Sequence, residues 1–344
     1  MIVKSKAPLR ISFAGGGSDL PSYYKKYDGI VINATINSFA HCSIEARDSE
    51  IIFEASDLGI ISKHKLETEI KDSELKLHQG IYYRIVKDFN NSDALAIAVC
   101  SSCDAPAGSG LGSSSTLTVA IIQAYSEYLN LSLSKEDIAR LACKVERQDL
   151  GLSGGKQDHY AAAYGGINHI EFSANDVVTV NPIELEAQFI SKLESSLVIY
   201  YTGRSRESAN IIDKQNKDIQ AENSQHLDAI HQIKKLCPNI KKALLDSDLV
   251  ALAKCLEQSW QAKKQSCSLV TNEFIDDIYK LAKENGALAG KISGAGGGGF
   301  MLFLVEANQK AQLIKSLEAK AGFILNCEFE TKGCHSWKLD SVAK

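Results

Sequence analysis

The chain has 344 residues, 44% of them hydrophobic and 23% charged, which is typical of an ordinary globular protein and long enough to predict two domains. Its 38 basic and 42 acidic residues give a formal net charge of -4, so no general attraction to nucleic acid or to an anionic membrane is expected. The N-terminal segment lacks the apolar core of a signal peptide, and no run of about 18 apolar residues predicts a membrane span. We therefore expect a cytoplasmic protein with no nucleic-acid or membrane partner, in which any binding of phosphate is local.

The nine cysteines have no repeating spacing, which favours reduced thiols over a disulfide framework. Cys100 and Cys103 form a single C-x-x-C pair. A zinc site would need a second pair or a histidine cluster, and Cys334 with His335 is too little to supply one. We predict structural thiols and no metal site at these positions.

The first part of the chain predicts a sheet followed by helices. Short apolar or β-branched segments, separated by turn residues, are expected to form strands at residues 2–3, 9–14, 29–36, 40–45 and 51–54. The apolar segment 95–99 then leads, through a glycine-rich run, to a stripe that predicts a helix from residue 113 to about 128. Ser134 and Asp137 have the spacing of a capping box for the next helix, and Glu146 lies near the end of that helix.

Helices dominate the second half of the chain. Residues 166–172 and 196–201 are strand-like, residues 207 to about 261 have helical spacing, and a further helix from about 272 to 285 is stopped by Gly286. An apolar strand is expected at residues 300–305. Because the composition shifts from sheet to helix near residues 173–190, we predict an N-terminal domain over residues 1–180 and a C-terminal domain over residues 181–344.

The run PAGSGLGSSST at residues 106–116 is the most informative local pattern. Its glycines are expected at a helix N-terminus, where unpaired N–H groups and the helix dipole attract a phosphate chain. Its hydroxyl groups either cap the helix or bind a metal ion on the phosphates, and a flexible surface loop is the alternative interpretation of the glycines alone. The residues expected to contact a nucleotide are Pro106, Ala107, Gly108, Ser109, Gly110, Leu111, Gly112, Ser113, Ser114 and Ser115.

Two other glycine-rich segments argue against common nucleotide-binding folds. Residues 151–157 look like a Walker loop, but the glycine spacing is short and Gln157 replaces the required Ser or Thr. Residues 14–19 follow a strand but lack the G-x-G-x-x-G order of a dinucleotide site. A P-loop NTPase and a nicotinamide enzyme are therefore disfavoured.

Three motifs together resemble the superfamily of galactokinase, homoserine kinase, mevalonate kinase and phosphomevalonate kinase, the GHMP kinases. KAPLRISFAGGGSDLP at residues 6–21 is similar to the first motif of that family, the run at 106–116 to the second, and KISGAGGGGFMLF at 291–303 to the third. The resemblance implies an α+β, two-domain GHMP kinase fold, with an N-terminal domain like domain 2 of ribosomal protein S5 and a ferredoxin-like C-terminal domain. Nucleotide and acceptor would meet in the cleft between them. As an alternative, the glycines of the third motif form only a tight strand connection.

Within this family the chain is most similar to the sugar 1-kinases that act on D-glycero-D-manno-heptose 7-phosphate, through the segments GGKQDHYAAAYGG at 154–166 and YYTGRSRES at 200–208. Gly16 and Gly17 stand where galactokinases carry Glu-His, which argues against galactose. The implied reaction transfers the γ-phosphate of ATP to the anomeric O1, giving the 1,7-bisphosphate for nucleotide-activated heptose and surface polysaccharide. The alternatives are an L-fucose-type sugar 1-kinase, an isoprenoid or homoserine kinase, and a non-catalytic sugar and ATP sensor of the same fold.

The resemblance also implies roles for single residues. Asp158 matches the aspartate that serves as base or orienting anion for the attacking hydroxyl, and Arg10, a permanent cation, would touch acceptor and phosphate oxygens. Ser114 and Glu146 match the hydroxyl and carboxylate at Mg2+, and Asp19 matches the aspartate that holds sugar hydroxyls. The structural alternatives are a surface strand position for Arg10, a turn or helix-cap position for Asp158 and a solvated helix position for Glu146.

A sugar phosphate brings a second dianion, which needs cations of its own. We expect Lys156, Arg204 and Arg206 to supply them, unless they are merely solvated surface charges. ATP and Mg2+ are the expected cofactors, and the sugar phosphate is the other small-molecule partner. A homodimer is a possible oligomeric state. Residues 56–91 are expected to contribute to the pocket for the adenine base. The residues expected to contact the acceptor are Gly16, Gly17, Ser18, Asp19, Lys156, Arg204, Arg206, Gly294, Gly296 and Gly297.

Overall fold

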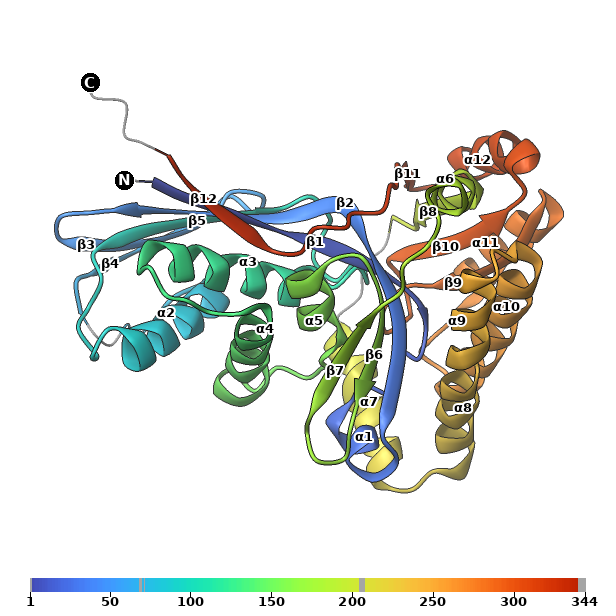
Figure 1. The fold of residues 1–344 in the computed structure, drawn as a ribbon, viewed down its shortest axis with the longest axis horizontal. Helices are drawn as coiled ribbons and strands as arrows, with labels where there is room; N and C mark the ends of the chain where they lie inside the picture. The colour runs from blue at the N-terminus through green and yellow to red at the C-terminus, as the bar shows by residue number, and fades with distance from the viewer. Residues whose placement is uncertain (1, 68–69, 71, 204–207, 340–344) are drawn as a thin grey trace.

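The computed structural model describes residues 2–67, 70, 72–203 and 208–339, and within them the strands form two sheets (Figure 1). The larger sheet has the order β12-β1-β2-β5-β3-β4, and β6 and β7 extend it from β2. Its strands are β1 (Ile2–Ala14), β2 (Gly29–Ala46), β3 (Glu50–Ala55), β4 (Ile60–Lys65), β5 (Ile97–Cys103), β6 (Ile167–Phe172), β7 (Val178–Pro182) and β12 (His335–Leu339). The smaller sheet has the order β11-β8-β10-β9 and consists of β8 (Leu197–Tyr201), β9 (Ala287–Ile292), β10 (Phe300–Val305) and β11 (Phe323–Leu325).

Helices lie on both sheets. The first half of the chain contains α1 (Pro21–Tyr27), α2 (Lys76–Phe89), α3 (Ser113–Tyr128), α4 (Lys135–Lys144), the π-helical turn η1 (Val145–Asp149) and α5 (Gln157–Tyr164). The second half contains α6 (Ala187–Ser196), α7 (Ser208–Gln220), α8 (Ser224–Lys235), α9 (Cys237–Leu245), α10 (Leu249–Ser266), α11 (Glu273–Glu284), the short 3-10 turn η2 (Ala307–Gln309) and α12 (Lys310–Glu318). Figure 1 shows α2 to α5 beneath the larger sheet, where their apolar faces form one core with it.

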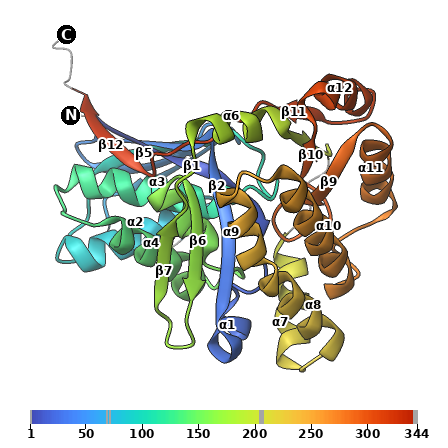
Figure 2. The ribbon, with the colours of Figure 1, turned by 45° about the vertical axis from the view of Figure 1, so that its right-hand side comes forward.

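A second core joins the two sheets. Leu9 and Ile11 of β1 are fully buried in the same apolar cluster as Ile199 of β8 and Leu256 of α10. Helix α9 lies beside β2 in Figure 2, and both α9 and α10 contact β1. Because burial of shared apolar surface is the main stabilising contribution, this core holds the two halves of the chain in one arrangement.

Most of the predicted elements are confirmed, but several are longer or divided. The helix at 113–128 and the strand at 300–305 are found at those bounds, and the capping box of Ser134 and Asp137 begins α4. The predicted strands at 2–3 and 9–14 are one strand, β1, and those at 29–36 and 40–45 are one strand, β2. The intervening residues continue the ladder between these two strands, with register shifts between Pro8 and Arg10 and between Ser12 and Ala14. Residues 208–266 divide into four helices, and α1, α2, α5, α6 and α12 were not predicted.

The last strand crosses the predicted division of the chain. Residues 335–339 form β12, which pairs antiparallel with β1, so the larger sheet contains residues from both predicted domains. All nine cysteines are free thiols. In the parts of the chain that the structure describes, no helix combines the length and the apolar composition needed to cross a bilayer.

Two glycine-rich turns meet where the two sheets join. Gly294, after β9, has a φ of +71°, and a Cβ atom there would lie 2.7 Å from the Cα of Gly110, before α3. Gly110 has a φ of +87°, and its own Cβ would lie 2.5 Å from the carbonyl oxygen of Ser293. The backbone N–H of Phe300 donates to the carbonyl of Ser109 at 2.8 Å, which ties the turns together. Only glycine on both sides lets the two backbones approach this closely.

We predict that Gly294→Ala lowers the free energy of unfolding by about 2 to 4 kcal/mol, because the methyl group is both overpacked and attached to a left-handed backbone. Gly59→Ala is the matched control, since Gly59 has a similar φ of +66° but no atom within 4 Å of its Cβ position. The control should lose only about 1 kcal/mol. Urea unfolding measures both values, and equal losses would contradict the close contact of the turns.

Candidate active site

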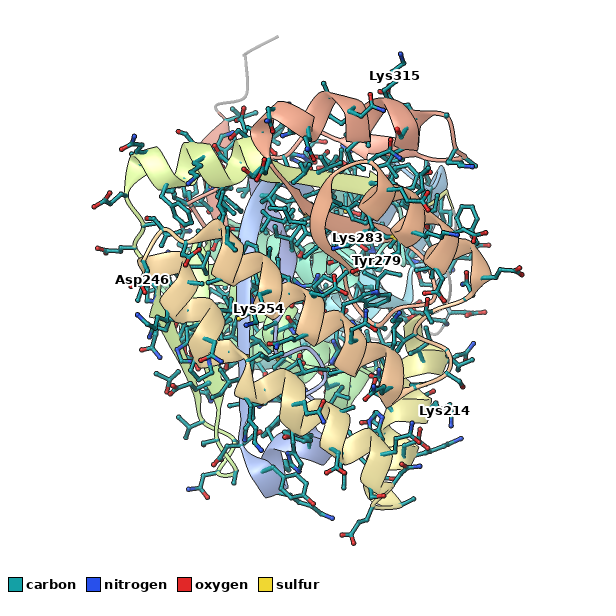
Figure 3. The ribbon with its side chains drawn as sticks, turned by 90° about the vertical axis from the view of Figure 1, so that its right-hand side faces the viewer. Lys214, Asp246, Lys254, Tyr279, Lys283 and Lys315 are labelled. Carbon is teal, nitrogen blue, oxygen red and sulfur yellow. The ribbon has the colours of Figure 1, made fainter. Side chains whose placement is uncertain are left out.

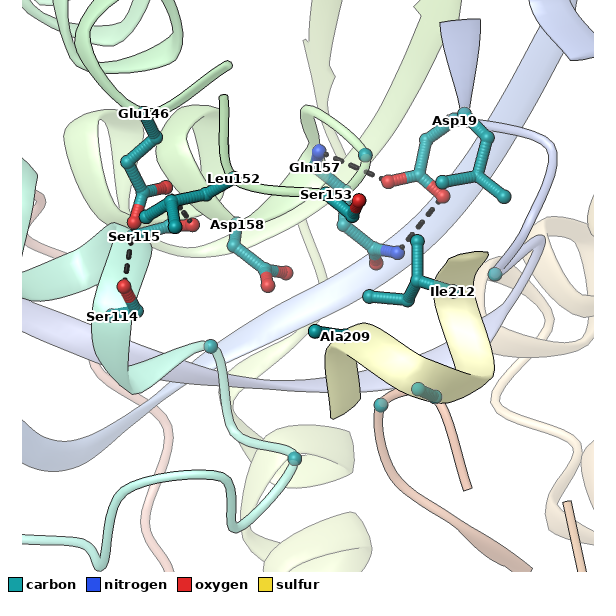
Figure 4. A pocket seen from close by; sticks show the side chains of 18 of the residues that line it. Asp19, Ser114, Ser115, Glu146, Leu152, Ser153, Gln157, Asp158, Ala209 and Ile212 are labelled. Carbon is teal, nitrogen blue, oxygen red and sulfur yellow. Dashed lines mark hydrogen bonds between the residues drawn. The ribbon is translucent and has the colours of Figure 1, made fainter. Parts of the chain in front are cut away.

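The two turns border a cavity of about 570 Å³, a size that suits a small-molecule ligand. Its other walls are the loop between β1 and α1, the loop at residues 151–155 before α5, and one face of α7 (Figure 4). The predicted site residues that line it are Arg10, Gly16, Gly17, Asp19, Ala107, Gly108, Gly110, Gly112, Ser113, Ser114, Ser115, Glu146, Asp158 and Gly294. The fold therefore brings residues from all three sequence motifs into one cavity.

Arg10 lies at the centre of this arrangement and is only 3% exposed. Its Nε donates to Oδ1 of Asp158 at 2.6 Å, and its Nη1 donates to the carbonyl of Gly110 at 2.7 Å and to Oγ of Ser293 at 3.4 Å. Its backbone N–H also donates to the carbonyl of Leu111. A buried guanidinium needs such partners, so the side chain holds Asp158 and both glycine turns in fixed relation.

Glu146 lies at one end of the cavity, on the π-helical turn that continues α4 and widens the helix at this point. One carboxylate oxygen accepts from Oγ of Ser114 and the other from Oγ of Ser115, each at 2.6 Å (Figure 4). The second oxygen also pairs with Nε2 of His159 at 2.6 Å. Burial by itself raises the pKa of Glu146, but the charge and hydrogen bond of His159, with Arg147 nearby, outweigh burial and lower the pKa. The cavity therefore presents an ionised carboxylate beside the serine hydroxyls.

Asp19 lies at the other end, on the loop between β1 and α1. Its carboxylate accepts from the backbone N–H of Gly17 at 3.1 Å and from the backbone and side-chain amides of Gln157 at 3.3 and 3.2 Å. A Cβ atom on Gly155 would overlap this carboxylate, so the loop at 151–155 is packed directly against it. Burial and the charge of Asp158 raise the pKa of Asp19 above its usual value. The two aspartates therefore act on one another across the same part of the cavity.

The turn before α3 has the geometry of an anion-binding site. Gly112 is the N-cap residue, and no side chain caps the first N–H groups of the helix, which begins at Ser113. Unpaired N–H groups at a helix N-terminus, together with the helix dipole, attract phosphate. A Cβ atom on Gly112 would lie 3.0 Å from Cγ of Asp158, so the anion site and this carboxylate are neighbours.

Some predicted residues support the cavity without lining it. Ser109 and Leu111 are fully buried and contribute backbone carbonyls, and Oγ of Ser18 donates to the carbonyls of Gly15 and Ile30. Pro106 is outside the lining.

Other predicted acceptor residues are not brought to the cavity. Lys156 donates to Asp176 at 2.7 Å and faces a second cavity of about 870 Å³, so the expectation that it points toward the acceptor is not met. Its direction follows from this ion pair and from the ring of Tyr24, over which its ammonium group lies. Gly296 and Gly297 pack against Val270 instead of the cavity. Arg204 and Arg206 lie outside the described residues.

Sequence reasoning missed several lining residues. Arg147 donates to the carbonyls of Leu152, Ser153 and Gly155 and so closes the loop at 151–155. Lys263 reaches the cavity from α10, and α7 contributes an apolar and polar face through Ala209, Ile212 and Gln215. Arg147 directly follows Glu146 in the sequence, and this position was a signal that could have identified it. Lys263 belongs to no motif, so the sequence carried no such signal for it.

The buried pair of His159 and Glu146 predicts a pH-dependent stability. Burial by itself lowers the pKa of His159, but Cys143 and the Glu146 carboxylate raise it, and the net shift is upwards. The contribution of His159 is therefore complete below about pH 6.5 and decreases as the pH rises towards the higher folded-state pKa. The contribution of Glu146, whose pKa is lowered, is complete above about pH 4.5 and is lost only in stronger acid.

We accordingly expect the stability advantage of the wild type over His159→Gln to shrink as the pH rises from about 6.5 to about 10, because only the wild type carries the imidazolium. Urea unfolding of both proteins at several pH values measures this difference. A difference that stays constant with pH would show that the histidine is neutral in the folded protein.

Comparison with known proteins shows the family. The model of the GHMP kinases N terminal domain matches residues 76–166, and the model of the GHMP kinases C terminal domain matches residues 223–322. A Campylobacter jejuni protein named D-glycero-alpha-D-manno-heptose 7-phosphate kinase is 41% identical, over 98% of this chain and 99% of that protein.

Two further relatives cover almost all of this chain. The crystal structure of a D-glycero-D-manno-heptose 1-phosphate kinase from Bacteroides thetaiotaomicron is 38% identical, with a TM-score of 0.84 over 98% of this chain and 100% of that one. The bifunctional fucokinase/GDP-fucose pyrophosphorylase of Arabidopsis thaliana is 26% identical over 98% of this chain but only 32% of that protein. With matches to both family models and a relative of 41% identity along nearly its whole length, this chain belongs to the GHMP kinase family, whose members use ATP and whose two-sheet fold it shares.

Proposed function

We propose that this protein transfers the γ-phosphate of ATP to the anomeric O1 of D-glycero-D-manno-heptose 7-phosphate, giving the 1,7-bisphosphate. The observation that carries the proposal is the position of Arg10, which contacts Asp158 and both glycine turns in the cavity that Asp19 also lines. The heptose is supported by the relative at 41% identity, whose name states this substrate.

The nucleotide end of the cavity suits a triphosphate with its metal ion. The backbone at the N-terminus of α3 would bind the phosphate chain, and the hydroxyl of Ser114 with the carboxylate of Glu146 would hold Mg2+. These are hard oxygen donors of the kind Mg2+ prefers, and the ionised state of Glu146 adds the charge such a site needs. When bound, the ion supplies neutralisation of the phosphate charge.

The acceptor end supplies positioning and a proton acceptor. Oδ1 of Asp158 accepts from Nε of Arg10, while Oδ2 accepts no hydrogen bond from the residues that the structure describes and is open to the sugar O1–H. As O1 attacks the γ-phosphorus and the bond to the bridging oxygen of ADP breaks, Asp158 takes the O1 proton and Arg10 stabilises the charge on the transferred group. Asp19 accepts from a further sugar hydroxyl and orients the ring.

Incubation with ATP, Mg2+ and a panel of acceptors tests this function, with phosphorus NMR to locate the new phosphate. The panel contains the heptose as free sugar, 1-phosphate and 7-phosphate, together with L-fucose, galactose, mevalonate and homoserine. We expect turnover of the 7-phosphate with a new O1 phosphate, and none without Mg2+. The 1-phosphate is included because the Bacteroides thetaiotaomicron relative is named for it. Preferred turnover of L-fucose, or tight binding of sugar and ATP without turnover, would overturn the proposal.

We predict that Asp158→Asn lowers kcat by about 100- to 10,000-fold, because the amide cannot take a proton. The protein should stay folded, since the amide oxygen can still accept from Nε of Arg10. Asp176→Asn is the matched control, because Asp176 also pairs with a cation, Lys156, but outside the cavity. Steady-state kinetics measures both variants, and similar losses in the two would remove Asp158 from the reaction.

A further inference from the structure

The cavity has three basic residues among the described positions of its wall, and two of them are already paired with a carboxylate. Arg10 is held by Asp158, Gly110 and Ser293. Arg147 uses Nε and both Nη atoms on the loop at 151–155, on Ser115 and on Glu146. The third is Lys263, near the C-terminal end of α10.

Lys263 is buried but has spare hydrogen-bond donors. Lys263 is only 8% exposed, and its Nζ donates to the carbonyl of Gly294. An ammonium group has three N–H donors, and within the described part of the chain no acceptor is found for the other two. Burial, with the charge of Arg10, lowers the pKa of Lys263 to about 8, while Asp19 acts in the opposite direction. A buried cation without a carboxylate partner is costly in the empty protein and is relieved when an anion binds.

Lys263 lies towards the acceptor end of the cavity. The charged groups that act on Lys263 are Arg10 and Asp19, whereas those that act on Glu146 are His159 and Arg147. Lys263 also donates to the backbone carbonyl of Gly294, in the turn of the third motif. An anion at Lys263 is therefore near the group expected to hold the sugar, away from the end suited to Mg2+.

We propose that Lys263 binds the phosphate that the acceptor itself carries and so makes the enzyme select a phosphorylated sugar over the free sugar. This inference rests on the proposed function and adds a residue to it. Two free donors on a buried ammonium group give a charge-assisted contact to a phosphate dianion, while Asp19 repels it towards the lysine. Asp19 would then bind sugar hydroxyls, Lys263 the distal phosphate and Asp158 the reacting hydroxyl.

The test compares Lys263→Met and Lys263→Arg with Lys254→Met, a matched control on the outer face of the same helix (Figure 3). For each protein, kcat and KM are measured with the heptose 7-phosphate, the free heptose and ATP. Selectivity is the ratio of kcat/KM for the phosphorylated sugar to kcat/KM for the free sugar. In Lys263→Met we expect this ratio to fall by about 10- to 100-fold, because the KM for the phosphorylated sugar rises. Lys263→Arg should recover part of it, and Lys254→Met should match the wild type.

Two outcomes would overturn the inference while leaving the proposed function intact. One is an unchanged selectivity in Lys263→Met, and the other is a rise confined to the KM for ATP, which would place the lysine on the nucleotide. Failure of the wild type to use any heptose phosphate would instead reject the proposed function.

A readout without turnover keeps the inference testable in that case. We expect inorganic phosphate to raise the thermal unfolding temperature of the wild type and of Lys254→Met more than that of Lys263→Met. The same measurement without phosphate shows whether each variant is folded. Equal stabilisation of folded Lys263→Met and the wild type by phosphate would contradict an anion site at Lys263.

Discussion

A single buried charge, the guanidinium of Arg10, is the interaction on which the rest of the site depends. Its partners are Asp158 at the start of α5, Gly110 before α3 and Ser293 after β9. The first two lie in the half of the chain that builds most of the larger sheet, and the third directly follows a strand of the smaller sheet. Because a buried cation is costly unless it is neutralised and hydrogen-bonded, satisfying Arg10 also fixes the distance between the two halves. The same contact that stabilises the join of the sheets therefore positions the proposed base.

Charges are separated along the cavity. Glu146 is paired with His159 at one end, and two aspartates with Lys263 lie towards the other. Such separation lets two polyanions occupy one cavity, since each meets its own donors and cations and the engaged Arg10 lies between them. A second buried lysine, Lys291 of β9, donates to the carbonyls of Ser12 and Phe13 and has no access to the cavity wall. It joins the sheets, and the contrast shows that burial alone does not distinguish a binding lysine from a structural one.

Local patterns predicted the elements whose stabilising contacts lie close together in the sequence. The helix beginning at Ser113 and the capping box at Ser134 depend on neighbours within one or two turns, and both are found as expected. The length of β1 and β2 depends on their pairing with each other, and the place of β12 depends on β1, more than 300 residues away. Contacts of that range leave no local signature, so the strands were predicted in pieces and the return of the C-terminal strand was not foreseen.

The sequence by itself determined which residues are chemically able to form the site. The sequence shows the glycine motifs, an arginine in a predicted strand, and an aspartate after Gly154 and Gly155. These residue types and spacings can be recognised because close approach of the backbone and anion binding require them. Only the tertiary structure decided where side chains of equal chemistry point. Lys156 lies within the segment at 154–166 yet pairs with Asp176 outside the cavity, while Lys263 belongs to no motif and reaches the cavity from α10. The physical reason is that the direction of a long, charged side chain is set by the partners that packing places around it, and those partners come from distant parts of the chain.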